Sequence, residues 1–204
     1  TKNEIVKDYG MPFFVAELNT SHFGNMDIAR KMIFEAKKAG CDCVKFQSWS
    51  EDSLYTKEYY KENPIAKRFL KKFSLSATEL SDLVLYCKDI GIRFASTPYS
   101  RSEVDFLLKE PDVPFIKVAS MDLNNHPFLE YIGSSAKPIV LSTGMGLINE
   151  VEQAVEVLEN AGASKICILH CVAVYPPEID TLQLNNILGL RDKFKSYPIG
   201  YSDH

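Results

Sequence analysis

Seven short apolar segments recur along this chain, and stretches whose apolar residues follow helical spacing separate them. In residues 27–39, for example, the apolar side chains fall on one face of a helix, and Gly40 ends the pattern. Apolar strands that alternate with helices predict a parallel sheet that is covered on its outer face. The predicted strands are Phe13–Leu18, Val44–Phe46, Ile92–Ala95, Phe115–Ala119, Ile139–Leu141, Ile166–Leu169 and Pro198–Tyr201.

Three helix starts carry the pattern of a capping box, in which a polar cap is followed three residues later by Glu. They are Ser76–Glu79, Ser100–Glu103 and Asn149–Glu152, the last with Asn as the cap. Residues 51–72 are charged and rich in Tyr, and Asn63–Pro64 interrupts them. We expect this segment to be an elaborated loop over the strand ends.

Polar residues able to do chemistry follow nearly every predicted strand. In a parallel α/β barrel, the C-terminal ends of the strands and the loops after them build the active site. A doubly wound open sheet shares the strand–helix rhythm, but its ligand normally binds at one switch point. The pattern therefore favours an α/β barrel. The polar residues are Glu17, Lys45, Gln47, Ser96–Thr97, Lys117, Ser120, Ser142–Thr143, His170, Ser202 and His204.

Lys45 and Lys117 lie in apolar strands, where an unpaired ammonium group is costly to bury. With hydroxyl groups at the neighbouring strand ends, they predict a site for a phosphate or carboxylate on which both lysines converge. The alternative is a lysine that pairs with a strand-end carboxylate such as Glu17. Residues 142–146 (STGMG) contain glycines that let backbone N–H groups approach an anion, or that serve only a tight turn.

Two further groups are candidates for chemistry. Glu17, in an otherwise apolar strand, is a candidate general base, or a group that binds a sugar hydroxyl or a metal-bound water. His204, in the sequence Ser-Asp-His, is a candidate metal ligand. His170 is instead expected to be a core histidine with its hydrogen bonds satisfied.

The composition narrows the class of protein. The chain has 204 residues, 46% of them hydrophobic, which suits one sizeable core. A net charge of −4 argues against a nucleic-acid partner, and no apolar run approaches the roughly 20 residues that span a bilayer. Five cysteines without a C-x-x-C pair predict reduced, mostly buried thiols in a cytoplasmic protein and no zinc site.

The chain resembles the sialic acid synthase family over almost its whole length. The resemblance rests on seven motifs in the same order: VAELNTSHFG, CDCVKFQSW, FASTP, IKVASMDL, VLSTGMG, LHCVAVYPPE and GYSDH. It implies a TIM-type (β/α)8 barrel that uses Mn²⁺ or Mg²⁺. It also implies a homodimer, in which a small antifreeze-like domain covers the active site of the partner subunit.

The resemblance also implies roles for individual residues. Glu17 and His204 would be catalytic, with His204 one of two histidine ligands of the metal, and Gln47 and Tyr175 would contact the sugar. The phosphoenolpyruvate site would comprise Lys45, Thr97, Lys117, Ser120, Ser142 and Ser202. The chain departs from the family at residues 21–24 (SHFG), where Asn-His-Asn-Gly is common, and at Ala173, where relatives often carry Asn or Ser.

The implied reaction is the condensation of phosphoenolpyruvate with an N-acyl amino sugar of the N-acetylmannosamine type, a transferase reaction of carbohydrate biosynthesis. Two alternatives remain open. One is an aldolase that forms a Schiff base through Lys117, and the other is a non-catalytic barrel that binds a sugar or a phosphate.

The count of strands adds an expectation about completeness. A closed barrel of this type needs eight strands, and seven are predicted. We therefore expect residues 1–204 to be one barrel truncated after its seventh strand, without the second metal histidine and the antifreeze-like domain. Such a fragment should show little or no synthase activity alone.

Overall fold

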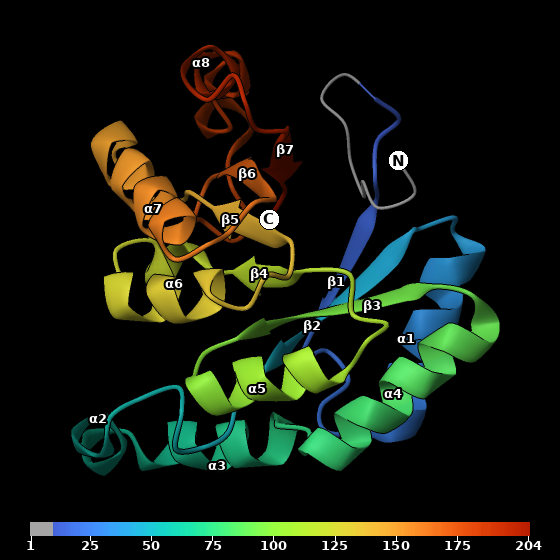
Figure 1. The fold of residues 1–204 in the computed structure, drawn as a ribbon. Coiled ribbons are helices and arrows are strands. Elements are labelled where there is room, and N and C mark those ends of the chain that lie inside the picture. Colours follow the sequence, from blue (N-terminus) through green and yellow to red (C-terminus); the bar gives the residue numbers. More distant parts are fainter. Residues whose placement is uncertain (1–9) are drawn as a thin grey trace. The chain divides into compact units, whose positions relative to one another are not determined.

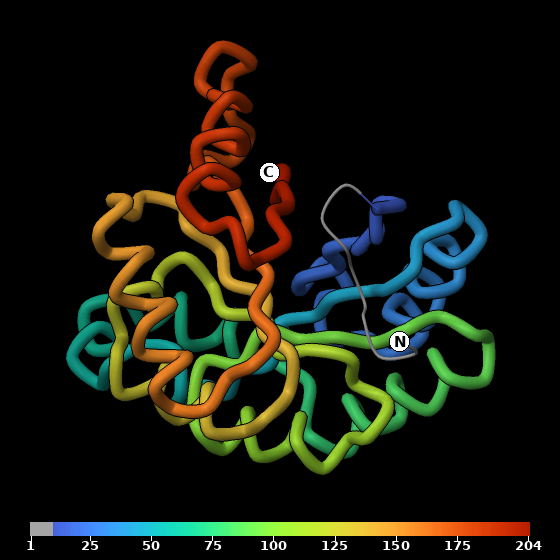
Figure 2. Tube along the Cα trace, turned by 45° about the horizontal axis from the view of Figure 1, so that its top comes forward, coloured from blue at the N-terminus to red at the C-terminus, as the bar shows by residue number. Residues whose placement is uncertain are grey.

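The computed structural model describes residues 10–204, which fall into two compact units. Residues 13–114 form one unit, and residues 115–204 form the other together with residues 10–12. Within each unit the chain runs alternately along strands and helices (Figures 1 and 2). Each unit is an α/β structure whose strands are parallel to their neighbours.

The unit of residues 13–114 holds three of the predicted strands. Strand β2 pairs with β1 on one side and with β3 on the other. The register places Glu17 opposite Lys45 and Gln47 opposite Thr97. Its elements are β1 (Val15–Asn19), α1 (Met26–Lys38), β2 (Cys43–Ser48), α2 (Lys57–Glu62), α3 (Pro64–Phe73), α4 (Ala77–Ile90), β3 (Arg93–Pro98) and α5 (Arg101–Lys109).

The unit of residues 115–204 holds the other four predicted strands, which pair in chain order. Helices α6 and α7 pack against each other in this unit (Figure 1). Its elements are β4 (Ile116–Val118), the 3-10 helix η1 (Ser120–Asp122), α6 (His126–Gly133), β5 (Ile139–Ser142), α7 (Ile148–Asn160), β6 (Ile166–Cys171), the 3-10 helix η2 (Ile179–Thr181), α8 (Asn186–Lys193) and β7 (Ile199–Ser202).

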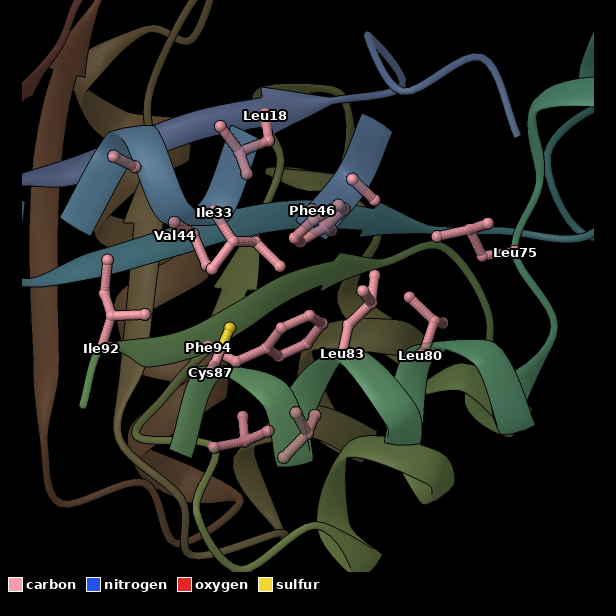
Figure 3. Close-up of a cluster of buried hydrophobic side chains, with 14 of the residues drawn as sticks. Leu18, Ile33, Val44, Phe46, Leu75, Leu80, Leu83, Cys87, Ile92 and Phe94 are labelled. Atoms are coloured by element: carbon pink, nitrogen blue, oxygen red, sulfur yellow. The ribbon is translucent and has the colours of Figure 1, made fainter. Parts of the chain in front are cut away.

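The first unit packs one face of its strands against α1 and α4. Figure 3 shows Leu18, Val44 and Phe46 of β1 and β2 directed toward Ile33 of α1 and Leu83 of α4. Successive side chains of a strand point to opposite faces. The residues between these apolar ones, Lys45 among them, therefore lie on the face that α1 and α4 do not cover.

The second unit repeats this division. The residues Ile116, Ile139 and Ile166 stand opposite one another in the register and are buried, as are the residues two positions further along each strand. The alternate positions form the other face, which carries polar side chains. These alternate positions are Lys117, Val140, Ser142, Cys167, Leu169, Cys171, Gly200 and Ser202.

One predicted helix start is confirmed in full. Ser76 Oγ accepts from Glu79 N at 3.3 Å, and the Glu79 carboxylate accepts from Ser76 N at 2.8 Å. The second is only partly right, because helix α5 begins after Ser100 but the Ser100 side chain makes no capping hydrogen bond. The third is wrong, because α7 begins at Ile148 and Glu150 caps it by accepting from Leu147 N at 2.7 Å.

The prediction of a loop over residues 51–72 is also wrong, because α2 and α3 occupy most of it. Thr56 caps α2 through a hydrogen bond from Tyr59 N to Thr56 Oγ1 at 3.2 Å. Pro64, taken as a breaker, is the first residue of α3, a position where its missing N–H costs nothing. The charges that suggested a loop lie on exposed helix surface.

The confirmed capping box makes a testable prediction for stability. Ser76→Ala should lower the free energy of unfolding by about 1 kcal/mol, measured by urea denaturation, because an N-cap hydrogen bond is lost. Hydrogen bonds from Ser76, the backbone N–H first, lower the pKa of Glu79 below its ordinary value of 4.5. The box therefore stabilises the fold above about pH 4.5, and this contribution should disappear as the pH falls further.

Asn149→Ala is the matched control, because Asn149 is exposed in the first turn of α7 and does not cap it. A loss for Asn149→Ala as large as that for Ser76→Ala would contradict the assignment of the caps.

Candidate active site

Glu17, Lys45 and Thr97 form a polar group on the open face of the first unit. Lys45 Nζ makes an ion pair with Glu17 Oε2 and donates to Thr97 Oγ1 at 3.2 Å. The register explains the pair, because Glu17 and Lys45 are direct neighbours on β1 and β2. Pairing of Lys45 with Glu17 is the alternative that the sequence left open, and it occurs together with the contact to Thr97.

Gln47 belongs to the same face. It lies two residues after Lys45 on β2 and stands opposite Thr97 in the register. Its side chain is half-buried. A carboxylate, an ammonium, an amide and a hydroxyl thus line one face near the strand ends, a set that suits recognition of a polar or anionic ligand.

Lys117 is the centre of a second polar group, in the unit of residues 115–204. It is 6% exposed, and its Nζ donates to Ser142 Oγ and to the Val118 carbonyl, both at 2.6 Å. Ser142 is also buried, at the end of the neighbouring strand β5. The Lys117 side chain is thus buried beside a hydroxyl group and a carbonyl, and these hydrogen bonds offset part of the cost of burying its ammonium group. The predicted convergence of Lys117 with Lys45 on one anion stays a prediction.

The glycine turn after β5 lies against Ser120. Gly144 N donates to Ser120 Oγ at 2.9 Å, so this backbone N–H binds a side chain of the site. Any Cβ at position 144 would lie 2.9 Å from Ser120 Oγ and from Cys171 Sγ, and 3.3 Å from the Ala173 Cβ. Gly144 is therefore required for close packing rather than for an unusual backbone angle.

Ser202 and Cys171 lie opposite each other where β6 and β7 end. Both belong to the face that carries Lys117 and Ser142. Cys171 Sγ lies 3.2 Å from Ser120 Oγ. Cys171 was not predicted as a site residue from the sequence. Alternation along β6 nevertheless places it on the same face as Leu169, which is the face that carries Lys117 and Ser142 in the neighbouring strands.

His204 and Tyr175 contact each other. Their rings are stacked with centroids 4.1 Å apart, and Tyr175 Oη lies 3.2 Å from His204 Nε2. His204 Nδ1 hydrogen-bonds the carbonyl of Val172. A carbonyl only accepts, so Nδ1 donates its proton there, and Nε2 is the ring nitrogen that faces Tyr175 Oη. Nε2 is therefore the atom of His204 that could bind a metal.

The described residues do not by themselves make a metal site. In residues 10–204, no group of three or more His, Cys, Asp or Glu side chains is placed to hold a metal ion. A metal site in a protein generally needs at least three protein ligands, or fewer protein ligands together with several bound waters. His204 thus fits as one ligand only, and the predicted Mn²⁺ or Mg²⁺ site stays a prediction.

The structure confirms the prediction of a core histidine at position 170 and the burial of most of the cysteines. His170 is buried, and its Nε2 hydrogen-bonds the Leu182 carbonyl at 2.8 Å, as expected of a satisfied core histidine. All five cysteines are free. Burial raises the pKa of the Cys87 thiol to about 12, so that thiol stays protonated at neutral pH. Within the described residues, no helix is both long and apolar enough to cross a bilayer.

These features define a class of protein: an α/β protein of parallel strands, with lysines on the strands and hydroxyl groups at or close to the strand ends. The model of the NeuB family matches residues 32–204, and the chain belongs to that family. The predicted resemblance to sialic acid synthases is thereby confirmed.

Two curated relatives cover 94% of the chain each. An uncharacterized protein of Methanocaldococcus jannaschii is 41% identical over 194 residues, which are 55% of its length. The N-acetylneuraminate-9-phosphate synthase of Drosophila melanogaster is 34% identical over 200 residues, which are 54% of its length. The chain thus spans about half the length of these relatives.

A solved structure shows the same fold. The N-acetylneuraminic acid (sialic acid) synthetase of Leptospira borgpetersenii superposes with a TM-score of 0.86 at 31% identity, over 94% of this chain and 65% of that one. The predicted fold, an α/β chain of TIM-barrel type with seven strands, is confirmed by this likeness and by the order of the elements.

Proposed function

We propose that this protein condenses phosphoenolpyruvate with an N-acetylmannosamine-type sugar to give a sialic-acid-like nonulosonate and phosphate. The observation that carries the proposal is the buried Lys117 ammonium with Ser142 at 2.6 Å, on a strand-end face that also holds Ser120. Membership of a family whose named relatives are synthases of this kind supports it.

The polar groups fit the charges of phosphoenolpyruvate. Its phosphate and carboxylate need cationic and hydroxyl donors in a place where water competes little. We propose that six residues supply these donors: Lys45, Thr97, Lys117, Ser120, Ser142 and Ser202. Of the two lysines, Lys117 is the more deeply buried. Lys45 is held beside Thr97 by its ion pair with Glu17.

The proposed reaction forms one carbon–carbon bond and breaks one carbon–oxygen bond. C3 of phosphoenolpyruvate attacks the aldehyde carbon of the open-chain sugar, and a cationic centre develops at C2. Water adds to C2, and the tetrahedral intermediate expels phosphate by cleavage between C2 and the bridging oxygen. Glu17 is the candidate to take a proton from this water or to place it, because its carboxylate is only partly buried and faces the open side of β1.

Gln47 and Tyr175 are proposed to contact the sugar, and His204 is proposed to supply one nitrogen to a divalent-metal site. The stacking of Tyr175 on His204 supports a common role for the two residues. Because residues 10–204 bring no three potential ligands together, the proposed Mn²⁺ or Mg²⁺ needs ligands beyond His204.

The test is phosphate release by the full-length protein in the presence of Mn²⁺. Release from phosphoenolpyruvate should require an N-acyl mannosamine-type sugar, and a panel of such sugars would identify the acceptor. The Schiff-base alternative instead predicts a covalent pyruvate adduct on Lys117 after treatment with borohydride. A barrel that only binds would show neither phosphate release nor an adduct.

A further inference from the structure

Ser120 has two hydrogen-bond partners within its own unit of the fold. Its Oγ accepts from Gly144 N at 2.9 Å and lies 3.2 Å from Cys171 Sγ. These partners come from the turn after β5 and from the end of β6. Both partners are uncharged, so these contacts orient the Ser120 hydroxyl group and add no charge to the site.

The space around these three residues is tightly filled. A Cβ on Gly144 would lie 2.9 Å from both Ser120 Oγ and Cys171 Sγ, closer than real Cβ atoms approach such groups. Cys171 is 6% exposed, so its thiol has little freedom to turn toward water. The Ser120 side chain is therefore held between a backbone N–H and a buried thiol.

The hydrogen-bonding capacity of the Ser120 hydroxyl limits how it can use these two partners. A hydroxyl has one proton to donate and two lone pairs that accept. Gly144 N–H uses one lone pair, because a backbone N–H can only donate. A thiol is a weak donor and a weak acceptor, so Cys171 can occupy the second lone pair without demanding the hydroxyl proton.

We propose that Cys171 is a positioning residue for Ser120. By donating S–H to Ser120 Oγ, Cys171 leaves the hydroxyl proton to be donated to an anionic oxygen of the bound substrate. This inference rests on the proposed role of Ser120 in binding phosphoenolpyruvate. Cys171 itself does not touch the substrate, and no covalent chemistry at its sulfur is involved.

The experiment measures the dissociation constant of phosphoenolpyruvate by calorimetry, and its KM and kcat, in the full-length protein. Cys171→Ala should raise the dissociation constant and KM about two- to tenfold, as expected for one neutral hydrogen bond, with a smaller change in kcat. Cys171→Ser keeps a donor and should recover most of the affinity. Cys167→Ala is the control, because Cys167 lies on the same face of β6 four residues earlier, about 13 Å away along the strand.

A double-mutant cycle tests whether Cys171 acts through Ser120. Ser120→Ala should weaken binding about tenfold or more, and Cys171→Ala should then have no further effect. If Ser120→Ala leaves binding unchanged, the proposed function of the site fails. If Ser120→Ala weakens binding but Cys171→Ala does not, or if its effect adds fully to that of Ser120→Ala, only the role of Cys171 fails.

A second pair of variants covers the case in which Cys171→Ala does not fold. Cys171→Thr and Cys171→Val fill nearly the same volume, but only Thr offers a donor. The inference predicts tighter binding of phosphoenolpyruvate by the Thr protein than by the Val protein, and equal binding would overturn it.

Discussion

Replacing Lys117 by Met should weaken binding of phosphoenolpyruvate by roughly 10- to 150-fold. The factor corresponds to the roughly 1.5–3 kcal/mol that a hydrogen bond to a charged group typically contributes. Lys117 is 6% exposed, so its charge acts on a ligand with little screening by water. Calorimetric titration of the full-length protein with phosphoenolpyruvate would measure the change.

Lys165→Met is the matched control for this substitution, because Lys165 is an exposed lysine of the same unit. Its affinity should equal that of the unchanged protein. Urea denaturation of both variants would show that they fold. A folded Lys117→Met protein that binds phosphoenolpyruvate as tightly as the control would remove Lys117 from the proposed site.

Replacing Phe46 by Ala should lower the free energy of unfolding by about 3–5 kcal/mol. Phe46 is fully buried, and its ring is stacked on that of Phe94 with centroids 5.3 Å apart (Figure 3). Its position on β2 places it between the strands and the helices α1 and α4, where the structure can relax only partly around a cavity. Because a domain of this size is stabilised by about 5–15 kcal/mol, the loss would bring the unit close to unfolding.

Phe34→Ala is the control for the core substitution, because Phe34 is 50% exposed on α1. Its free energy of unfolding should change much less than that of Phe46→Ala. The measurement is the midpoint of urea denaturation. A shift of the midpoint with an unchanged slope of the transition reports a change in stability. A loss below about 1 kcal/mol for Phe46→Ala would show that this cluster is not the core of the unit.

The strands were predictable because each is a short apolar run with a clear end. The helices α2 and α3 were missed because tyrosines and charges dominate residues 51–72, and the helical spacing of Ile65, Phe69 and Phe73 is hidden among them. Asn149 was mistaken for a cap because two glutamates come closely after it, and the sequence alone does not decide which one closes the first turn.

Part of the candidate site was predictable from periodicity alone. Alternation along β2 places Lys45 and Gln47 on one face, and parallel pairing brings Thr97 beside them. The contacts of Ser120 with Cys171 and of Tyr175 with His204 were not predictable, because they join residues 51 and 29 positions apart. They depend on the path of the loops after the strands, which obeys no simple periodic rule.

The most direct test of the proposed condensation tracks the bridging oxygen of phosphoenolpyruvate. The full-length protein would be given phosphoenolpyruvate labelled with ¹⁸O at that oxygen, together with Mn²⁺ and the N-acyl mannosamine-type sugar that supports turnover. The proposal predicts that the label leaves with the phosphate and that no phosphate forms without the sugar. Unlabelled phosphate, or phosphate released equally without the sugar, would contradict it.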